Sequence, residues 1–245
     1  MQTRNLIENK LKEVDVVILC GGIGSRLRAI VDDRPKPMAQ INQQPFLDIL
    51  IDYFRGFGFS RFVLCTGHMS EVIQEHYSHK KGSLEFIVSN EQIPLGTAGS
   101  IKNAERFIQS EPFLVANGDS FCPMDLAEFY DFHLSRQALM SMAVVESEVT
   151  ADCGLVTLDS LQRIISFKEK KAKARTGYIN AGIYLFQKNI LSLIPENTKY
   201  SLEYDLFPSL TNLDSFAFIS CEELIDIGTP ERYERARSFF SVEAK

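Results

Sequence analysis

Residues 14–27 read VDVVILCGGIGSRL, an apolar run that passes directly into a turn rich in glycine. The run from Val14 to Cys20 is nearly continuous in apolar side chains, which is typical of a strand buried on both faces of a parallel sheet. We therefore expect this segment to lie inside a parallel sheet, with the glycine turn at its carboxyl end.

The segments that follow alternate between strand-like and helix-like spacing of their apolar residues. The strand-like runs are 61–65, 84–89 and 112–116, and the helix-like ones are 46–57, 70–77 and 98–109. This alternation is typical of right-handed βαβ units, so it predicts an α/β fold with an open, mostly parallel sheet flanked by helices. In such sheets a ligand is expected in a cleft at the carboxyl ends of the strands.

The second half of the chain is richer in strands and poorer in helices. Its strand-like runs are 140–146, 155–158, 163–167, 178–186 and 215–220. A helix is expected over 202–210, where Pro208 disturbs its end, and a charged helix follows Thr229-Pro230. Because no repeat or linker separates the halves, we expect one domain over residues 1–245, with halves of about 14–120 and 121–245.

The composition narrows the class of protein. The 245 residues carry a net charge of −6, which argues against a protein that coats nucleic acid, because such binding needs an excess of Lys and Arg. No stretch approaches the roughly 20 apolar residues that a membrane-spanning helix needs. Residues 1–15 contain no apolar signal-peptide core. We therefore expect a cytoplasmic protein with neither a nucleic-acid partner nor a membrane partner.

The glycine turn and the segment after it suit a phosphate ligand. Glycines allow the backbone to turn tightly and to approach a ligand closely, and exposed N–H groups beside a helix start attract an anion. Arg26 adds planar donors, and Lys36 lies between Pro35 and Pro37, which restrict its backbone. The pattern is neither a P-loop nor G-x-G-x-x-G, so the turn alone indicates only that an anion lies close to the backbone.

A series of short motifs follows in a fixed order. They are Cys20–Leu27 (CGGIGSRL), Arg34–Met38 (RPKPM), Pro94–Gly99 (PLGTAG), Asn117–Asp119 (NGD), Phe167–Lys170 (FKEK), Asn180–Tyr184 (NAGIY) and Asp226–Pro230 (DIGTP). They are spread over the chain from Cys20 to Pro230. The set resembles the sugar-1-phosphate nucleotidyltransferases, most closely the bacterial D-glycero-D-manno-heptose 1-phosphate guanylyltransferases, with the mannose-1-phosphate guanylyltransferases nearby.

The resemblance implies a reaction and a fold. A sugar-phosphate oxygen would attack the α-phosphorus of a nucleoside triphosphate, releasing pyrophosphate and a nucleotide sugar for surface polysaccharide. The fold would be a single Rossmann-like, GT-A-like domain with a mixed, mostly parallel sheet. Its half 14–120 would bind the nucleotide and its half 121–245 the sugar. Because the attacking phosphate oxygen is already anionic, no general base is needed, and cations and positioning supply the catalysis.

The family motifs also assign roles to residues. The implied catalytic residues are Arg26, Lys36, Asp119 and Lys170. Asp119 and Asp226 each follow an apolar run, so they are expected at strand ends, where both could reach one Mg²⁺. The implied nucleotide-binding residues are Leu19, Gly21, Gly22, Gly24, Ser25, Glu91, Gly96, Thr97 and Gly118. The implied sugar-binding residues are Gly154, Glu169 and Asn180, with Lys168 as the alternative to Lys170 for the sugar phosphate.

Glu91 is the residue expected to select the base of the nucleoside triphosphate. The Watson–Crick edge of guanine presents two adjacent donors, and an ionised carboxylate accepts from both without offering a donor. Thymine and uracil present acceptors beside one donor, which a carboxylate would repel. The sequence therefore favours GTP over other triphosphates.

Several alternatives stay open at this point. The same chemistry could use mannose 1-phosphate, or CTP, UTP or dTTP, and an inactive regulatory homologue would keep the fold. The number of metal ions is open, and a homodimer is expected only from the family. Arg26, Lys36, Asp119, Lys170 and Asp226 are all retained, which argues against the inactive homologue.

Overall fold

The computed structural model describes residues 7, 9–22, 24–79, 82–148, 153–169, 176–211, 213–220 and 223–242. A nine-stranded sheet runs through them in the order β10-β9-β11-β6-β1-β4-β5, and β8 joins β11 to β12. The apolar run at the start of the chain forms β1 (Asp15–Leu19), which pairs in parallel with β4 (Arg61–Thr66) and with β6 (Phe113–Asn117). The parallel array continues to β5 (Glu85–Asn90).

The second half of the chain extends this same sheet. The long strand β11 (Gly177–Phe186) lies antiparallel to β6 and also pairs with β8 (Met140–Ser147) and β9 (Gly154–Leu158). The remaining strands are β10 (Ile164–Glu169), antiparallel to β9, and β12 (Ser215–Ser220), parallel to β8. The sheet is therefore mixed, as the resemblance implies, and both halves of the chain contribute to it.

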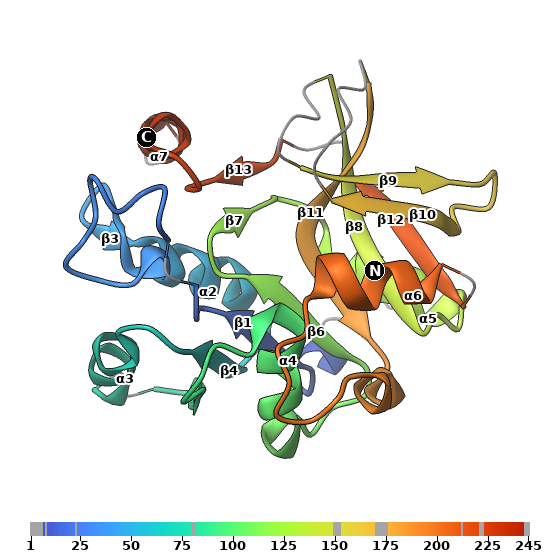
Figure 1. Ribbon diagram of the computed structural model, residues 1–245, viewed down its shortest axis with the longest axis horizontal. Helices are drawn as coiled ribbons and strands as arrows, with labels where there is room; N and C mark the ends of the chain where they lie inside the picture. The colour runs from blue at the N-terminus through green and yellow to red at the C-terminus, as the bar shows by residue number, and fades with distance from the viewer. Residues whose placement is uncertain are drawn as a thin grey trace.

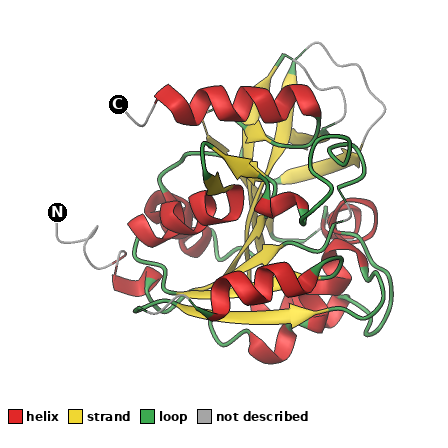
Figure 2. Cartoon of the chain, turned by 90° about the vertical axis from the view of Figure 1, so that its left-hand side faces the viewer, coloured by secondary structure: helices red, strands yellow, loops and turns green. Residues whose placement is uncertain are grey.

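Helices cover both faces of the sheet (Figures 1 and 2). Successive residues of β1 face opposite sides, so Val16 and Ile18 belong to one apolar cluster and Val17 to the other. The first cluster packs under α2 (Phe46–Gly56), α3 (Ser70–Ser78), α5 (Leu126–Ser135) and α7 (Pro230–Val242). The second packs under α4 (Gly96–Asn103), the 3-10 turn η3 (Lys188–Leu193), the π turn η4 (Leu202–Leu206) and α6 (Phe207–Leu210).

Some elements differ from the sequence-based expectation. The helix expected over 98–109 begins at Gly96 and ends at Asn103, and a 3-10 turn, η2 (Glu105–Phe107), follows it. The helix expected over 202–210 is divided into η4 and α6, with Pro208 in the first turn of α6, where its missing N–H is tolerated. Helix α5 was not expected at all; Asp125 caps it by accepting from the N–H groups of Ala127 and Glu128.

Two short ladders lie outside the main sheet. β7 (Ser120–Phe121) pairs with β13 (Ile225–Asp226), which places Ser120 opposite Asp226. β2 (Gln40–Ile41) and β3 (Gln44–Pro45) form a small hairpin after the 3-10 turn η1 (Lys36–Met38). The β7–β13 ladder matters most for the site, because it brings segments that are about a hundred residues apart to the carboxyl end of β6 (Figure 1).

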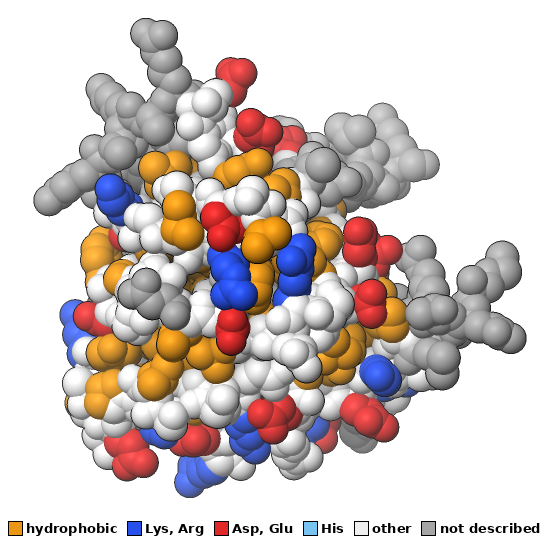
Figure 3. All heavy atoms as spheres, turned by 90° about the vertical axis from the view of Figure 1, so that its right-hand side faces the viewer, with side chains coloured by type: hydrophobic (Ala, Val, Ile, Leu, Met, Phe, Trp, Pro, Cys, Tyr) orange, Lys and Arg blue, Asp and Glu red, His pale blue; other side chains and the backbone are white. Residues whose placement is uncertain are grey.

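No helix in the described ranges is long and apolar enough to cross a bilayer. On the side that faces the viewer in Figure 3, hydrophobic side chains lie among Lys, Arg, Asp and Glu side chains in several separate groups.

The homodimer expected from the family stays a prediction.

The segment that leads into η4 is held against the start of α4 by backbone hydrogen bonds. The Tyr200 N–H donates to the Leu95 carbonyl at 2.8 Å, and the Gly99 N–H donates to the Tyr200 carbonyl at 2.9 Å. Gly96 has φ +73°, and a Cβ there would lie 2.7 Å from the Tyr200 oxygen. Only glycine fits this contact. We call residues 198–203, which these hydrogen bonds hold against α4, the docked segment.

Gly96→Ala should destabilise the protein, because the new Cβ is both strained at positive φ and too close to the Tyr200 carbonyl. We expect a loss of about 1–3 kcal/mol in the free energy of unfolding, measured by urea denaturation. Gly56→Ala is the matched control, since nothing lies within 4 Å of a Cβ at Gly56, in the last turn of α2. Equal stability of the two variants would contradict the docking of the segment on α4.

Candidate active site

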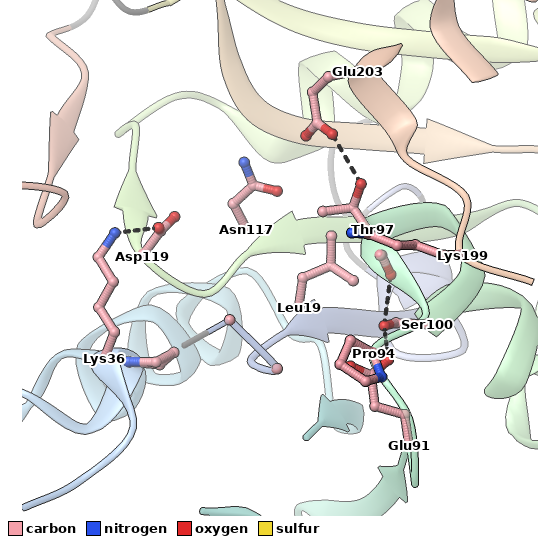
Figure 4. Close-up of a pocket in the computed structure, with 14 residues that line it drawn as sticks. Leu19, Lys36, Glu91, Pro94, Thr97, Ser100, Asn117, Asp119, Lys199 and Glu203 are labelled. Carbon is pink, nitrogen blue, oxygen red and sulfur yellow. Dashed lines mark hydrogen bonds and ion pairs between the residues drawn. The ribbon is translucent and has the colours of Figure 1, made fainter. Parts of the chain in front are cut away.

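A cavity of about 400 Å³ lies at the carboxyl ends of β1 and β6. Both halves of the chain line it, with Leu19, Gly21, Gly22, Lys36, Pro37, Glu91, Pro94, Gly96, Thr97, Ser100, Asn117, Asp119, Lys199 and Glu203. Figure 4 shows three corners: Lys36 with Asp119, then Glu91 with Pro94 and Ser100, and finally Thr97 with Glu203. The position agrees with the cleft expected at the strand ends.

The glycine turn forms one wall of the cavity through close backbone contacts. A Cβ at Gly24, where φ is +62°, would lie 3.0 Å from the Cβ of Lys36, so the turn packs directly against that lysine. The Gly118 N–H donates to the Leu19 carbonyl at 3.0 Å, and a Cβ at Gly118 would lie 2.6 Å from the same oxygen. Glycine is therefore required at both positions to bring the turn, Lys36 and the end of β6 together.

Lys36 and Asp119 form an ion pair at one corner. The Lys36 Nζ donates to Asp119 Oδ2 at 2.5 Å, and the lysine side chain is only 11% exposed. Withdrawal from water alone would raise the pKa of Asp119. The Lys36 ammonium, with hydrogen bonds from Lys36 and Ser120, overcomes that effect and lowers the pKa below its ordinary value. Asp119 is therefore an anion, and Lys36 places a positive charge inside the cavity.

Asp226 lies beside Asp119 through the β7–β13 ladder. The Ile227 N–H donates to the Asp119 carbonyl at 3.0 Å. The Asp226 carboxylate pairs with Arg232 at 3.2 Å and accepts from the Gly228 N–H at 2.8 Å. The ladder therefore brings the two aspartates to neighbouring positions at strand ends. Their convergence on one metal ion stays a prediction.

The donors at this corner fit a hard divalent cation. In the described ranges no group of three or more His, Cys, Asp and Glu side chains could hold a metal ion. Two carboxylates alone suit Mg²⁺, which usually keeps several waters and completes its shell with substrate phosphates. Asp119 and Asp226 therefore fit a metal that binds together with a triphosphate, and not a metal cage made by protein alone.

Glu91 occupies the second corner, directly after β5. Its Oε2 accepts from the Ser100 hydroxyl at 2.5 Å and from the Leu95 N–H at 3.3 Å. Its Oε1 lies between the glycine turn and the residue after β4, 3.4 Å from the position of a Cβ on Gly21 and 3.0 Å from that of a Cβ on Gly67. One oxygen is thus anchored to α4 and the other faces the cavity wall, which leaves the carboxylate oriented rather than mobile.

Thr97 and Glu203 form the third corner, where α4 meets the docked segment. The Thr97 hydroxyl donates to Glu203 Oε2 at 2.9 Å and accepts from the Leu202 N–H at 2.7 Å. Lys199 lines the cavity from the same segment. The hydroxyl of Thr97, an implied nucleotide contact, is thus occupied in holding the two halves of the wall together.

The residues implied for the sugar lie near this third corner. Gly154 and Glu169 are opposite each other in the β9–β10 pair, and a Cβ at Gly154 would lie 3.0 Å from Glu169 Oε2. Asn180 donates to the Tyr184 hydroxyl at 2.8 Å and accepts from the Gly182 N–H at 2.9 Å. Tyr184 is fully buried between these groups, so Asn180 is fixed by contacts within the protein.

Several implied residues do not line the cavity. They are Gly24, Ser25, Arg26, Gly118, Gly154, Lys168, Glu169, Asn180 and Asp226. Arg26 and Ser25 are exposed, and neither lines it. Lys168 is exposed on the face of β10 opposite to Phe167 and Glu169, because side chains alternate along a strand. Lys170 lies outside the described residues. The implied phosphate roles of these residues stay predictions.

The cavity also contains residues to which the sequence assigned no role. Ser100, Asn117 and Lys199 line it. Asn117 belongs to a quoted motif and follows a predicted strand, so its position at a strand end was the available signal. Ser100 lies one residue past its motif, and Lys199 precedes an unusual π turn, so no motif marks either of them.

Comparison with known proteins agrees with this geometry. The nucleotidyl transferase family model matches residues 15–242. A D-glycero-alpha-D-manno-heptose 1-phosphate guanylyltransferase from Campylobacter jejuni is 36% identical over 220 residues, covering 90% of this chain and 97% of that protein. The protein of the same name from Aneurinibacillus thermoaerophilus is 35% identical over 226 residues, covering 91% of this chain and 97% of its own.

A solved structure shares the whole fold. The crystal structure of HddC from Yersinia pseudotuberculosis superposes with a TM-score of 0.82 at 34% identity, covering 93% of this chain and 99% of that one. HddC is also known in complex with GMP-PN. The resemblance drawn from the motifs is confirmed, and so are the mixed α/β fold and the enzyme class. The chain belongs to the nucleotidyl transferase family.

Proposed function

We propose that this enzyme transfers GMP from GTP to D-glycero-D-manno-heptose 1-phosphate, releasing pyrophosphate. The observation that carries the proposal is that one cavity of about 400 Å³ is lined both by the Lys36–Asp119 corner and by the anchored Glu91 carboxylate. The two heptose 1-phosphate guanylyltransferases, each similar over about nine-tenths of this chain, support the choice of base and of sugar.

In this reaction a phosphate oxygen of the sugar 1-phosphate forms a bond to the α-phosphorus of GTP. The bond from that phosphorus to the bridging oxygen breaks, and the electron pair leaves with pyrophosphate. Lys36 offsets negative charge on the triphosphate, and the glycine turn presents backbone N–H groups at the same end of the cavity. The protein therefore holds two anions together and needs no proton-abstracting group.

A divalent ion completes the proposal, and we assign Mg²⁺ to Asp119 and Asp226. When bound, it would neutralise phosphate charge and polarise the α-phosphate. Arg26 and Lys170 stay in the proposal as phosphate contacts on the strength of the motifs alone. A cytoplasmic location also stays in it, because nucleoside triphosphates are made and kept in the cytoplasm.

The direct test is a matrix of triphosphates against sugar 1-phosphates, read by pyrophosphate release. We expect GTP with D-glycero-D-manno-heptose 1-phosphate to give the highest kcat/KM, above GTP with mannose 1-phosphate and above CTP, UTP or dTTP with the heptose. A higher value for another base would overturn the guanine assignment. Absence of pyrophosphate from every combination would indicate an inactive homologue.

Glu91→Gln should weaken the preference for guanine, because an amide offers a donor where the carboxylate offers only acceptors. We expect kcat/KM with GTP to fall roughly 10- to 100-fold relative to that with UTP. Glu75→Gln, on the exposed surface of α3, makes the same charge change away from the cavity and should leave the preference intact. An unchanged GTP-to-UTP ratio in Glu91→Gln would mean that another group reads the base.

Lys36→Met should remove the positive charge that the triphosphate meets. Loss of one well-placed charge stabiliser typically lowers the rate roughly 100- to 1000-fold, and we expect that loss in kcat. Lys12→Met, exposed on the surface before β1, removes an equal charge and serves as the control. A loss below tenfold, in a variant whose thermal unfolding is normal, would contradict the catalytic role of Lys36.

A further inference from the structure

Arg232, in the first turn of α7, pairs with Asp226 across the loop between β13 and α7 (Figure 1). Its Nη1 lies 3.2 Å from Asp226 Oδ2 and 3.4 Å from Oδ1. Oδ1 also accepts from the Gly228 N–H, whereas within the described part of the chain Oδ2 has Arg232 as its partner alone. Arg232 therefore holds the Asp226 oxygen that the protein does not otherwise use.

The helix itself does not explain this arginine. The first turn of a helix carries a partial positive charge, which attracts acidic side chains and repels basic ones. Glu231 follows this preference, and the Thr229 hydroxyl accepts from the Arg232 N–H at 3.3 Å as a cap. The Arg232 guanidinium stands where it is unfavourable for α7, so the charge of Asp226, and not the helix, accounts for its position.

Arg232 also lies close to the end of the site that is proposed to hold phosphates. A Cβ on Gly228 would lie 3.9 Å from Arg232 Nη1 and 3.8 Å from Lys36 Nζ, so both cations border the same small space. Lys36 in turn packs against the glycine turn at Gly24. Two basic side chains therefore stand here, each paired with one of the two aspartates.

Most of the Arg232 guanidinium is unused. Its Nη1 donates to Asp226, and among the residues that the structure describes its Nε and Nη2 donate to nothing. The side chain is 32% exposed, so the group can turn without breaking a buried contact. A guanidinium presents five donors in a planar fork that matches phosphate oxygens as well as carboxylates. Arg232 can therefore exchange one anionic partner for the other.

We propose that Arg232 is a phosphate-binding residue, which Asp226 holds in the free enzyme and releases when a divalent ion takes that carboxylate. The inference rests on the proposed function, since it assumes the ion at Asp119 and Asp226 and a triphosphate as substrate. Arg232 and the ion both need Asp226 Oδ2, so they compete in the free enzyme. Once released, Arg232 pairs with phosphate oxygens of the triphosphate, whose negative charge exceeds what one divalent ion neutralises.

Arg232→Gln should change the binding of metal and of nucleotide in opposite directions. Binding of Mn²⁺ to the free enzyme, measured by electron paramagnetic resonance of the unbound ion, should tighten roughly two- to fivefold, because a competing and partly exposed ion pair is removed. Binding of GTP at saturating Mg²⁺, measured by calorimetry without sugar phosphate, should weaken roughly 10- to 100-fold, as for loss of a hydrogen bond to a charged group. Arg232→Lys keeps the charge and should bind GTP more tightly than Arg232→Gln.

Arg237→Gln is the matched control, because it removes an equal charge from the exposed surface of the same helix, where Arg237 pairs with Glu234. Both bindings should match the wild type in this variant. A merely structural role of Arg232 would weaken both bindings and lower the temperature of unfolding, and would overturn the proposal, as would Mn²⁺ binding that is absent, unchanged or weaker. If the wild type releases no pyrophosphate with any substrate pair the proposed function fails, whereas Mn²⁺ and GTP binding still test Arg232.

Discussion

The close approach of the ends of β1 and β6 is the constraint on which the site depends. The Gly118 N–H extends the parallel ladder beyond β6 by donating to the Leu19 carbonyl, and no side chain at residue 118 would fit against that oxygen. This contact carries Asp119 to the glycine turn and to Lys36. The same end of β6 continues into β7, whose partner β13 brings Asp226. One backbone hydrogen bond thus aligns groups from three distant parts of the chain.

Each aspartate at the carboxyl end of β6 and in β13 forms an ion pair with a basic side chain. Lys36 pairs with Asp119, and Arg232 pairs with Asp226. An unpaired carboxylate in a partly enclosed site would be costly, so these pairs let the protein keep two acids side by side. If a divalent cation and a triphosphate bind as proposed, Asp119 and Asp226 would hold the cation and Lys36 would face the phosphates. The ion pair between Lys36 and Asp119 keeps both charges compensated until then.

Sequence reasoning predicted those parts of the molecule that depend on local pattern. Strand β1 was evident because its apolar run is nearly continuous. Lys36 and Asp119 were found because they belong to the quoted motifs, and Glu91 because the family resemblance assigns it to the nucleotide. Helix α5 was missed, although Asp125 followed by Glu128 is a capping signal that precedes it. Its apolar residues are too numerous to form a clear stripe.

The direction in which a side chain points was harder to predict than which residues belong to the site. Lys168 and Glu169 are neighbours in one motif, yet strand alternation turns them to opposite faces of β10. Glu203 reaches the cavity only because a π turn and the contact at Gly96 place it there, and both depend on packing between distant segments. Such positions follow from tertiary structure, which no short motif records.

The attachment of the docked segment has a consequence for how such an enzyme can change over evolution. Main-chain atoms of Leu95, Gly99 and Tyr200 hold the segment to α4, so these contacts do not depend on which side chain residue 199 carries. That side chain can be exchanged while the wall stays in place. A lineage can therefore reshape this wall of the cavity by substitution at residue 199, with the strand ends at the opposite wall left untouched.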